Sequence, residues 1–237
     1  MWKTAKIFLE ELLFPKICIG CGRQGQYFCD DCLSLAEIYD LQYCPYCSPP
    51  RPFYDGRVCH SHHSKIDSIF IASSYKNNNV KKALHLLKYE PCCKLLARDL
   101  AKLLYWHLLA CGKKPSDFSD CLLAPVPLHE KKLRRRGYNQ TQEIAKELGD
   151  MLQIPCEEIL LKIKENKSQT ELNRLERMQN VEGCYALNEH CSAKITGKNI
   201  LLLDDIFTTG ATMEECAKTL KTTKAKSVWA IAVAREF

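Results

Sequence analysis

The chain contains the stretch Leu201-Leu-Leu-Asp-Asp-Ile-Phe-Thr-Thr-Gly-Ala-Thr212, an apolar run followed by two carboxylates and a turn rich in hydroxyl groups. Residues 199–203 predict a buried strand and residues 213–221 predict a helix. Ligands of parallel sheets bind where the strands end, and the N–H groups at the start of a helix attract anions. The stretch therefore predicts a phosphate-binding loop between a strand and a helix.

The individual side chains of this stretch suit a phosphorylated sugar. The hydroxyl groups of the threonines can donate to phosphate, and Gly210 lets the backbone approach the ligand closely. Two adjacent carboxylates suit hydrogen bonds from vicinal sugar hydroxyls, with a divalent cation nearby. A helix N-cap is the simpler alternative, since Asp and Thr are common there, but the full pattern is more specific than a cap. The predicted site residues are Asp204, Asp205, Thr208, Thr209, Gly210, Ala211 and Thr212.

Strands and helices alternate along most of the chain. Further strands are predicted at 68–75, 121–126, 158–163 and 227–233, and helices at 80–110 with a break near Pro91, at 139–152 and at 172–178. Such alternation is typical of an α/β domain with a mainly parallel sheet. We expect this domain to span residues 66–237, after a small module at residues 1–65.

The chain has 15 cysteines, and seven of them fall within residues 18–59. Two C-x-x-C pairs, which comprise Cys18, Cys21, Cys29 and Cys32, have the spacing of a structural zinc site with four thiolate ligands. The alternative is a set of four reduced thiols without metal.

A second metal site is predicted from Cys44, Cys47, Cys59 and His62. His60 and His63 also lie near Cys59, but the two-residue spacing favours His62. The alternative is a degenerate knuckle that packing stabilises. The chain is thus expected to hold one or two Zn²⁺ ions.

Residues 2–15 have the apolar spacing of a short amphipathic helix, but the run is too short for a signal peptide or a membrane span. We expect this helix to pack on its own protein rather than to anchor it to a membrane. With metal-type cysteine spacing and no span elsewhere, the sequence predicts a cytoplasmic protein in a reducing compartment.

A basic cluster follows the strand predicted at 121–126. Because that strand and the phosphate loop should end at the same sheet edge, Arg134, Arg135 and Arg136, with Lys88, are predicted to contact pyrophosphate or a nucleic-acid backbone. The net charge of +6 permits such contacts without requiring them. The alternative is a solvated loop. Residues 168–183 could form a flap over the site, although a charged helical connection is the simpler interpretation.

The loop closely resembles the phosphoribosyl pyrophosphate signature of type I phosphoribosyltransferases. That resemblance implies that the acidic pair contacts the ribose hydroxyls, that residues 208–212 hold the 5′-phosphate, and that Mg²⁺ accompanies the ligand. The order of motifs also resembles the ComF family, which is linked to natural competence: paired cysteine knuckles, Leu87-Lys-Tyr89, Pro125-Val-Pro-Leu, Arg-Arg-Gly-Tyr-Asn-Gln140 and the loop. His62 departs from that family, where a fourth cysteine is usual.

The ComF resemblance implies a competence protein that binds phosphoribosyl pyrophosphate and handles single-stranded DNA, with competence helicase and recombination proteins as partners. Tyr138 would stack on bases and the basic cluster would attract the backbone. The alternative is an active glycosyltransferase that transfers phosphoribose to a nucleobase or amine. A third interpretation is a regulator that binds the nucleotide without turnover. The sequence does not identify an acceptor.

Overall fold

The computed structural model describes residues 15–39, 42–44, 46–47, 51–53, 62, 64–165 and 174–236. The helix predicted before Pro15 lies outside the described residues. Within them, no helix combines the length and apolar character that a membrane crossing requires.

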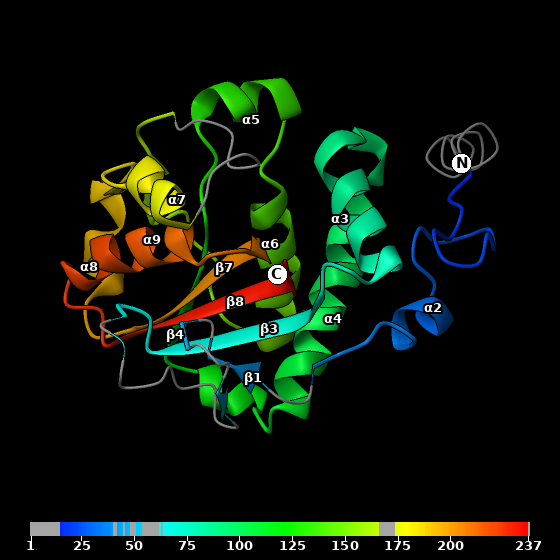
Figure 1. Ribbon diagram of the computed structural model, residues 1–237, viewed down its shortest axis with the longest axis horizontal. Helices are drawn as coiled ribbons and strands as arrows, with labels where there is room; N and C mark the ends of the chain where they lie inside the picture. The colour runs from blue at the N-terminus through cyan, green and yellow to red at the C-terminus, as the bar shows by residue number, and fades with distance from the viewer. Residues whose placement is uncertain are drawn as a thin grey trace, which may run out of the picture.

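A four-stranded parallel sheet forms the centre of the molecule (Figure 1). Its strands, in spatial order, are β3 (Ser68–Ser74), β8 (Ser227–Arg235), β7 (Asn199–Phe207) and β4 (Cys121–Pro125). Antiparallel pairs are formed by β5 (Leu160–Lys162) with β6 (Tyr185–Leu187), and by β1 (Gln42–Tyr43) with β2 (Pro52–Phe53). The predicted α/β class with a mainly parallel sheet is confirmed.

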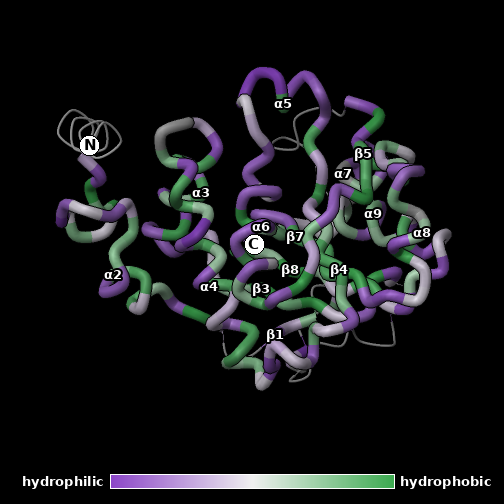
Figure 2. The backbone as a smooth tube through the Cα atoms, turned by 180° about the vertical axis from the view of Figure 1, so that it is seen from behind, coloured by the Kyte–Doolittle hydropathy of each residue, from purple (hydrophilic) through white to green (hydrophobic). Residues whose placement is uncertain are grey.

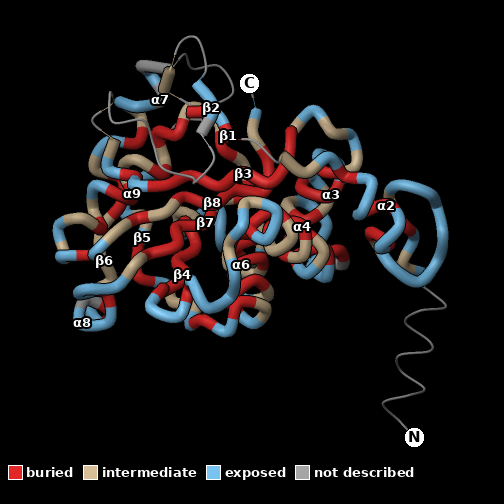
Figure 3. Tube along the Cα trace, turned by 90° about the horizontal axis from the view of Figure 1, so that it is seen from below, coloured by how far each residue is buried: buried red, intermediate tan, exposed pale blue. Residues whose placement is uncertain are grey.

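Helices cover both faces of the sheet, which explains why its strands are apolar on both sides. Leu201 and Leu203 pack among α3 (Asn78–Tyr89), α4 (Leu96–Ala110) and α6 (Gln140–Leu152), whereas Leu202 packs towards α9 (Ala211–Lys221). The strands consequently form a buried band through the middle of the molecule (Figure 3). The remaining helical segments are α2 (Asp30–Ser34), α7 (Arg174–Val181), α8 (Ser192–Ile195), η1 (Pro91–Leu95), η2 (Pro115–Phe118) and η4 (Glu189–Cys191).

Several element boundaries follow from local chemistry. The helix predicted at 80–110 is divided into α3 and α4 at Pro91, whose ring removes a backbone donor. Asn139 caps α6, since its side chain accepts a hydrogen bond from the N–H of Thr141 at 3.1 Å. Strand β7 extends to Phe207, beyond the predicted end at 203, so that both carboxylates lie within the strand.

The basic cluster forms a helix, α5 (Glu130–Arg136), instead of the loop that was the alternative. The N–H of Lys131 donates to Nδ1 of His129 at the start of α5, and Gly137 ends it with φ = +83°. This helix stands at the tip of the molecule and is mostly hydrophilic (Figure 2). A seven-residue helix with no buried side chain has no apolar periodicity for sequence analysis to detect.

The segment between the two cysteine clusters runs along the outer edge of β3. The N–H of Tyr39 donates to the carbonyl of Ala72 at 2.9 Å, and the side chain of Gln42 bonds both the carbonyl (3.2 Å) and the N–H (3.0 Å) of Ile71. These contacts cover an edge strand that would otherwise present free backbone groups. The cluster around Cys18 packs on the α3–α4 side of the sheet, and Cys44 packs on the α9 side.

Candidate functional site

A cavity of about 350 Å³ opens where β4, β7 and β8 end. Three segments far apart in the sequence form most of its wall: the end of α3, the segment that leads from β4 into α5, and the turn from β7 to α9. Its charged lining comprises Lys88, Lys132, Arg136, Lys162, Asp204, Asp205 and Glu236. Cations and carboxylates thus face one space, which suits a ligand with both anionic groups and hydroxyls.

The turn from β7 to α9 places three of the predicted loop residues on the cavity wall: Thr208, Gly210 and Thr212. The hydroxyl of Thr209 accepts a hydrogen bond from the N–H of Ala211, the first residue of α9, at 3.4 Å, and Ala211 is buried. Gly210 has φ = +81°, and a Cβ there would lie 2.7 Å from the ring of Phe207. Glycine is therefore required at this position by both conformation and space.

The two carboxylates lie side by side at the end of β7, but their pKa values are shifted in opposite directions. Asp205 is buried, which opposes ionisation, but Nζ of Lys88 at 2.7 Å lowers its pKa. Nε2 of Gln140 also donates to Asp205, at 3.3 Å. Burial and the neighbouring Asp205 raise the pKa of Asp204 well above its usual range. Within the described residues, Lys88 thus forms its ion pair with Asp205 and not with Asp204.

Residues 136–140 join the walls of the cavity. Arg136 donates to Oε1 of Gln140, and Nε2 of Gln140 donates to Asp205. The hydroxyl of Tyr138 donates to the carbonyl of Leu87, and Asn139 donates to the carbonyl of Val126 at 3.0 Å. The Arg-Gly-Tyr-Asn-Gln motif therefore fixes the end of α3, the end of β4 and the acidic pair relative to one another.

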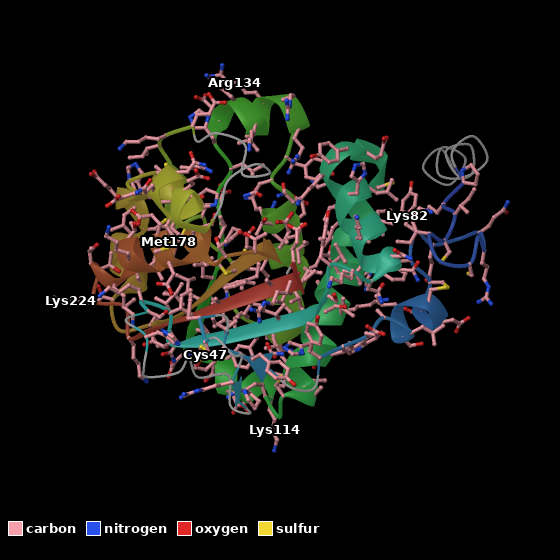
Figure 4. All side chains as sticks on the ribbon, in the orientation of Figure 1. Cys47, Lys82, Lys114, Arg134, Met178 and Lys224 are labelled. Atoms are coloured by element: carbon pink, nitrogen blue, oxygen red, sulfur yellow. The ribbon has the colours of Figure 1, made fainter. Side chains whose placement is uncertain are left out.

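The structure separates the predicted cations. Lys88 and Arg136 line the cavity, and Arg135 lines a neighbouring groove. Arg134 is 77% exposed, pairs with Glu130 on its own helix and points away from the molecule (Figure 4). Arg134 is not among the residues that line the cavity, so only part of the predicted cluster faces the site.

Two lysines that were not among the predicted site residues also line the cavity. Burial, together with nearby Lys132, lowers the pKa of Lys162, whose Nζ lies 5.3 Å from the centre of the Tyr185 ring. One indication in the sequence that Lys162 has a role in a site is that it is a charged residue inside the apolar run at 158–163. Proximity to the acidic pair, about 40 residues later, could not be deduced from that run.

The four cysteines of the first cluster come together as predicted. Their Sγ atoms all lie within 4.8 Å of one another, with 3.5 Å between Cys18 and Cys29 and 3.7 Å between Cys21 and Cys29. Tetrahedral Zn–S bonds give roughly 3.8 Å between sulfurs. Although burial opposes it, backbone N–H groups lower the pKa of Cys18 to about 6. The cluster can hold a metal ion.

The second cluster is described in part. Cys44, Cys47 and His62 come together, with 3.2 Å between Sγ of Cys47 and Nε2 of His62, while Cys59 lies outside the described residues. Tyr46, between the two cysteines, donates to Oε1 of Glu214 in the first turn of α9. The second knuckle therefore contacts the element that begins with the phosphate loop.

Comparison with known proteins supports the assignment of the fold. The family model of the phosphoribosyl transferase domain matches residues 133–236. Two solved structures align weakly: the allosteric regulatory enzyme of purine biosynthesis (16% identity, TM-score 0.39, 63% of this chain and 30% of that chain) and phosphoribosylpyrophosphate synthetase from Mycobacterium smegmatis (14%, 0.32, 85% and 75%). Together, the sheet and the family model define a chain with a phosphoribosyltransferase domain.

Curated relatives place the chain within that class. Competence protein F of Haemophilus influenzae is 28% identical over 86% of this chain and 84% of its own length. Competence protein ComFC of Bacillus subtilis is 26% identical (81% and 77%), and the DNA utilization protein YhgH of Salmonella typhimurium is 22% identical (86% and 82%). The predicted resemblance is confirmed: the chain is a homologue of the ComF-type competence proteins.

Proposed function

We propose that this protein binds phosphoribosyl pyrophosphate, or a closely related phosphoribose ligand, and acts in the uptake or utilisation of DNA. The observation that carries the first part is the convergence of the Thr208–Thr212 turn, the acidic pair and four cations on one cavity. The names of the relatives, two competence proteins and a DNA utilization protein, support the second part.

The groups on each wall of the cavity match the chemistry of a different part of the ligand. In this proposal the 5′-phosphate lies on the turn at the start of α9, where backbone N–H groups and the hydroxyls of Thr208 and Thr212 can donate. Asp204 and Asp205 accept from the ribose hydroxyls. Lys132, Arg136 and Lys162 face the pyrophosphate, with Mg²⁺ to balance the remaining charge.

The cysteine clusters have a structural role in this proposal. Cys18, Cys21, Cys29 and Cys32 bind one Zn²⁺, and Cys44, Cys47, His62 and Cys59 bind a second. Thiolate and imidazole ligands favour zinc among the divalent ions, and four protein ligands leave no open position for catalysis. We assign residues 1–65 to this zinc module and residues 66–237 to the phosphoribosyltransferase-like domain, in a cytoplasmic protein.

For DNA, we propose a single-stranded ligand bound along the basic side of α5. Lys131, Arg134 and Arg135 are exposed there, so they can attract a backbone without sequence preference. The partners would be the helicase and recombination proteins that process the incoming strand.

An active transferase is the second candidate, and the three cations facing the proposed pyrophosphate position favour it. Lys132, Arg136 and Lys162 could stabilise departing pyrophosphate while positive charge develops at C1 of the ribose. Among the described residues we assign none to the acceptor. A transferase would release pyrophosphate when a suitable nucleobase or amine is present.

One experiment separates the two candidates. The zinc-loaded chain is mixed with phosphoribosyl pyrophosphate and Mg²⁺, and its melting temperature and pyrophosphate release are measured with each nucleobase and with ammonia. Binding raises the melting temperature in both cases. Release with one acceptor would establish transfer, whereas a shift without release supports a binding protein. No shift at saturating ligand would contradict the proposal.

A further inference from the structure

A groove of about 320 Å³ adjoins the phosphoribose cavity. Its lining residues are Lys88, Tyr89, Arg135, Arg136 and Tyr138, and it shares the first two and Arg136 with the cavity. The ends of α3 and α5 form its two sides, and they stand next to each other in Figures 1 and 2. A ligand anchored in the cavity could therefore extend into the groove without crossing the protein surface.

Tyr89 presents an aromatic ring to this groove. It is the last residue of α3 and is 56% exposed, although an aromatic side chain gains most from burial. The guanidinium of Arg136 lies 5.7 Å from its ring centre, and the ring of His85 lies 4.7 Å away at a tilt of 46°. Its neighbours thus hold the ring in place while more than half of the side chain remains accessible.

Tyr138, the residue that the sequence suggested for base stacking, is already engaged. Its hydroxyl donates to the carbonyl of Leu87, and Nζ of Lys94 lies 5.5 Å from its ring centre. The side chain is half-buried between α3 and α6. Tyr138 consequently supports the groove, whereas Tyr89 is the ring that a ligand can reach.

The positive charge of the groove indicates that a base stacked on Tyr89 would be accompanied by phosphate groups. Arg135 is exposed, and within the described part of the chain no acidic side chain pairs with it. Lys88 and Arg136 add positive charge on the other side. A free nucleobase carries no charge to match these cations, but a base within a strand has a phosphate on each side.

From this arrangement we infer that Tyr89 is the base-stacking residue of a single-strand binding subsite, with Arg135 on the neighbouring phosphate. The inference rests on the proposed role in DNA handling and deepens it. Stacking on an aromatic ring together with a basic wall is the usual means of binding single strands without sequence preference. Because the groove opens into the cavity, a strand bound there would lie beside the phosphoribose ligand.

The test measures binding of a fluorescent oligothymidylate to the full zinc-loaded chain by anisotropy. Tyr89→Leu should weaken binding about tenfold, the loss expected for one stacked base, without changing the salt dependence. Tyr89→Phe should bind like the wild type. Arg135→Gln should weaken binding and reduce the slope against salt by about one ion. Tyr43→Leu, at another exposed tyrosine, is the matched control and should change nothing.

A strand of equal length with abasic sites identifies the base as the group on Tyr89. Wild type and Tyr89→Leu should bind that strand equally. The inference is overturned if Tyr89→Leu binds oligothymidylate as tightly as the wild type, or if free thymine displaces the strand at similar concentration. Calorimetry with phosphoribosyl pyrophosphate on the same variants tests the proposed ligand separately. If only the role of Tyr89 is wrong, the chain should still bind this ligand in the cavity.

Discussion

At the scale of single residues, Lys88 controls the charge of the acidic pair. It comes from the end of α3, more than 100 residues before Asp205, and forms the one ion pair of that buried carboxylate within the described residues. Asp204 forms no ion pair there, and burial together with the neighbouring Asp205 raises its pKa well above the usual range. The site is therefore prepared for one more cation, which is the role that we propose for Mg²⁺ with its ligand.

Replacing Lys88 by Met should reverse the pH dependence of stability. In the wild type, the pKa of Asp205 is depressed, so its stabilising effect is present above the unfolded-state pKa and is lost as the pH falls through the folded value. Without Lys88, burial raises that pKa, and stability should fall as the pH rises instead. Urea unfolding between pH 2 and 8 measures the change, because the wild-type loss falls below the unfolded-state pKa of about 3.9 and the loss in the variant falls above it.

The loss at pH 7 should be about 3 kcal/mol or more, because a buried charge is left unpaired. Lys82→Met, at an exposed lysine of the same helix, is the control and should cost little. The double variant Lys88→Met with Asp205→Asn should recover most of the lost stability. If Lys88→Met alone kept the wild-type pH profile, the pairing with Asp205 would be wrong.

At the scale of elements, the turn between β7 and α9 depends on one glycine. Gly210→Ala should abolish ligand binding, because its Cβ would collide with the ring of Phe207 at 2.7 Å and displace the turn. Gly197→Ala is the matched control: its φ is +74°, but no atom lies within 4 Å of the added Cβ.

Both alanine variants should lose about 1–2 kcal/mol to the left-handed conformation, and only Gly210→Ala should also lose the ligand. Thermal unfolding and calorimetry with phosphoribosyl pyrophosphate measure the two effects separately. Equal ligand affinity in the two variants would show that the turn is not the binding element.

The second knuckle and α9 form a further unit at this scale. Glu214 accepts hydrogen bonds from Tyr46, from Ser64 and, at 2.9 Å, from the N–H of Lys65. The hydroxyl of Tyr46 also lies 3.2 Å from the position of a Cβ on Gly210. The segment that carries the second cysteine cluster thus contacts both the turn at Gly210 and the first turn of α9.

Tyr46→Phe should therefore loosen the phosphate turn without removing the knuckle. We expect faster amide exchange in residues 208–214 and a fall in ligand affinity of severalfold, in line with one lost hydrogen bond to a charged group. The zinc content should stay unchanged. Tyr43→Phe, on the exposed side of β1, is the control. Unchanged exchange at 208–214 would contradict the coupling.

At the scale of the whole molecule, the amino-terminal segment surrounds the edge of the sheet. Its first cysteine cluster packs beside α3 and α4 and its second beside α9. Between the two clusters, Glu37, Tyr39 and Gln42 form hydrogen bonds with β3. Metal bound at either end would thus hold both helical layers against one strand. This arrangement protects an open sheet edge, which would otherwise present unpaired backbone groups.

The sequence predicted the parts of this structure that local chemistry determines. The strand at 199–203, the break at Pro91 and the thiol set beginning at Cys18 all follow from spacing and propensity. The sequence did not predict that Lys162 lines the cavity or that the two cysteine clusters lie on opposite sides of the sheet. Both depend on contacts between distant segments, which no short pattern encodes.

The position of the basic cluster was predicted only in part, also because it depends on structure that no short pattern encodes. Its place at the carboxyl edge of the sheet followed from the preceding strand, and Arg136 does line the cavity. Helix formation by residues 130–136 turns Arg134 outward, since neighbours on a helix point in different directions. The loop interpretation could not separate the arginines in this way.

The most direct test of the central claim is calorimetry of the zinc-loaded chain with phosphoribosyl pyrophosphate and Mg²⁺, comparing wild type with Thr208→Val. Thr208 lines the cavity, whereas Thr222, at the far end of α9, provides the control Thr222→Val. We predict one bound ligand per chain, an affinity about tenfold lower in Thr208→Val, and no change in Thr222→Val. Absence of binding to the wild type, or equal affinity in all three proteins, would contradict the assignment of this turn as the phosphoribose site.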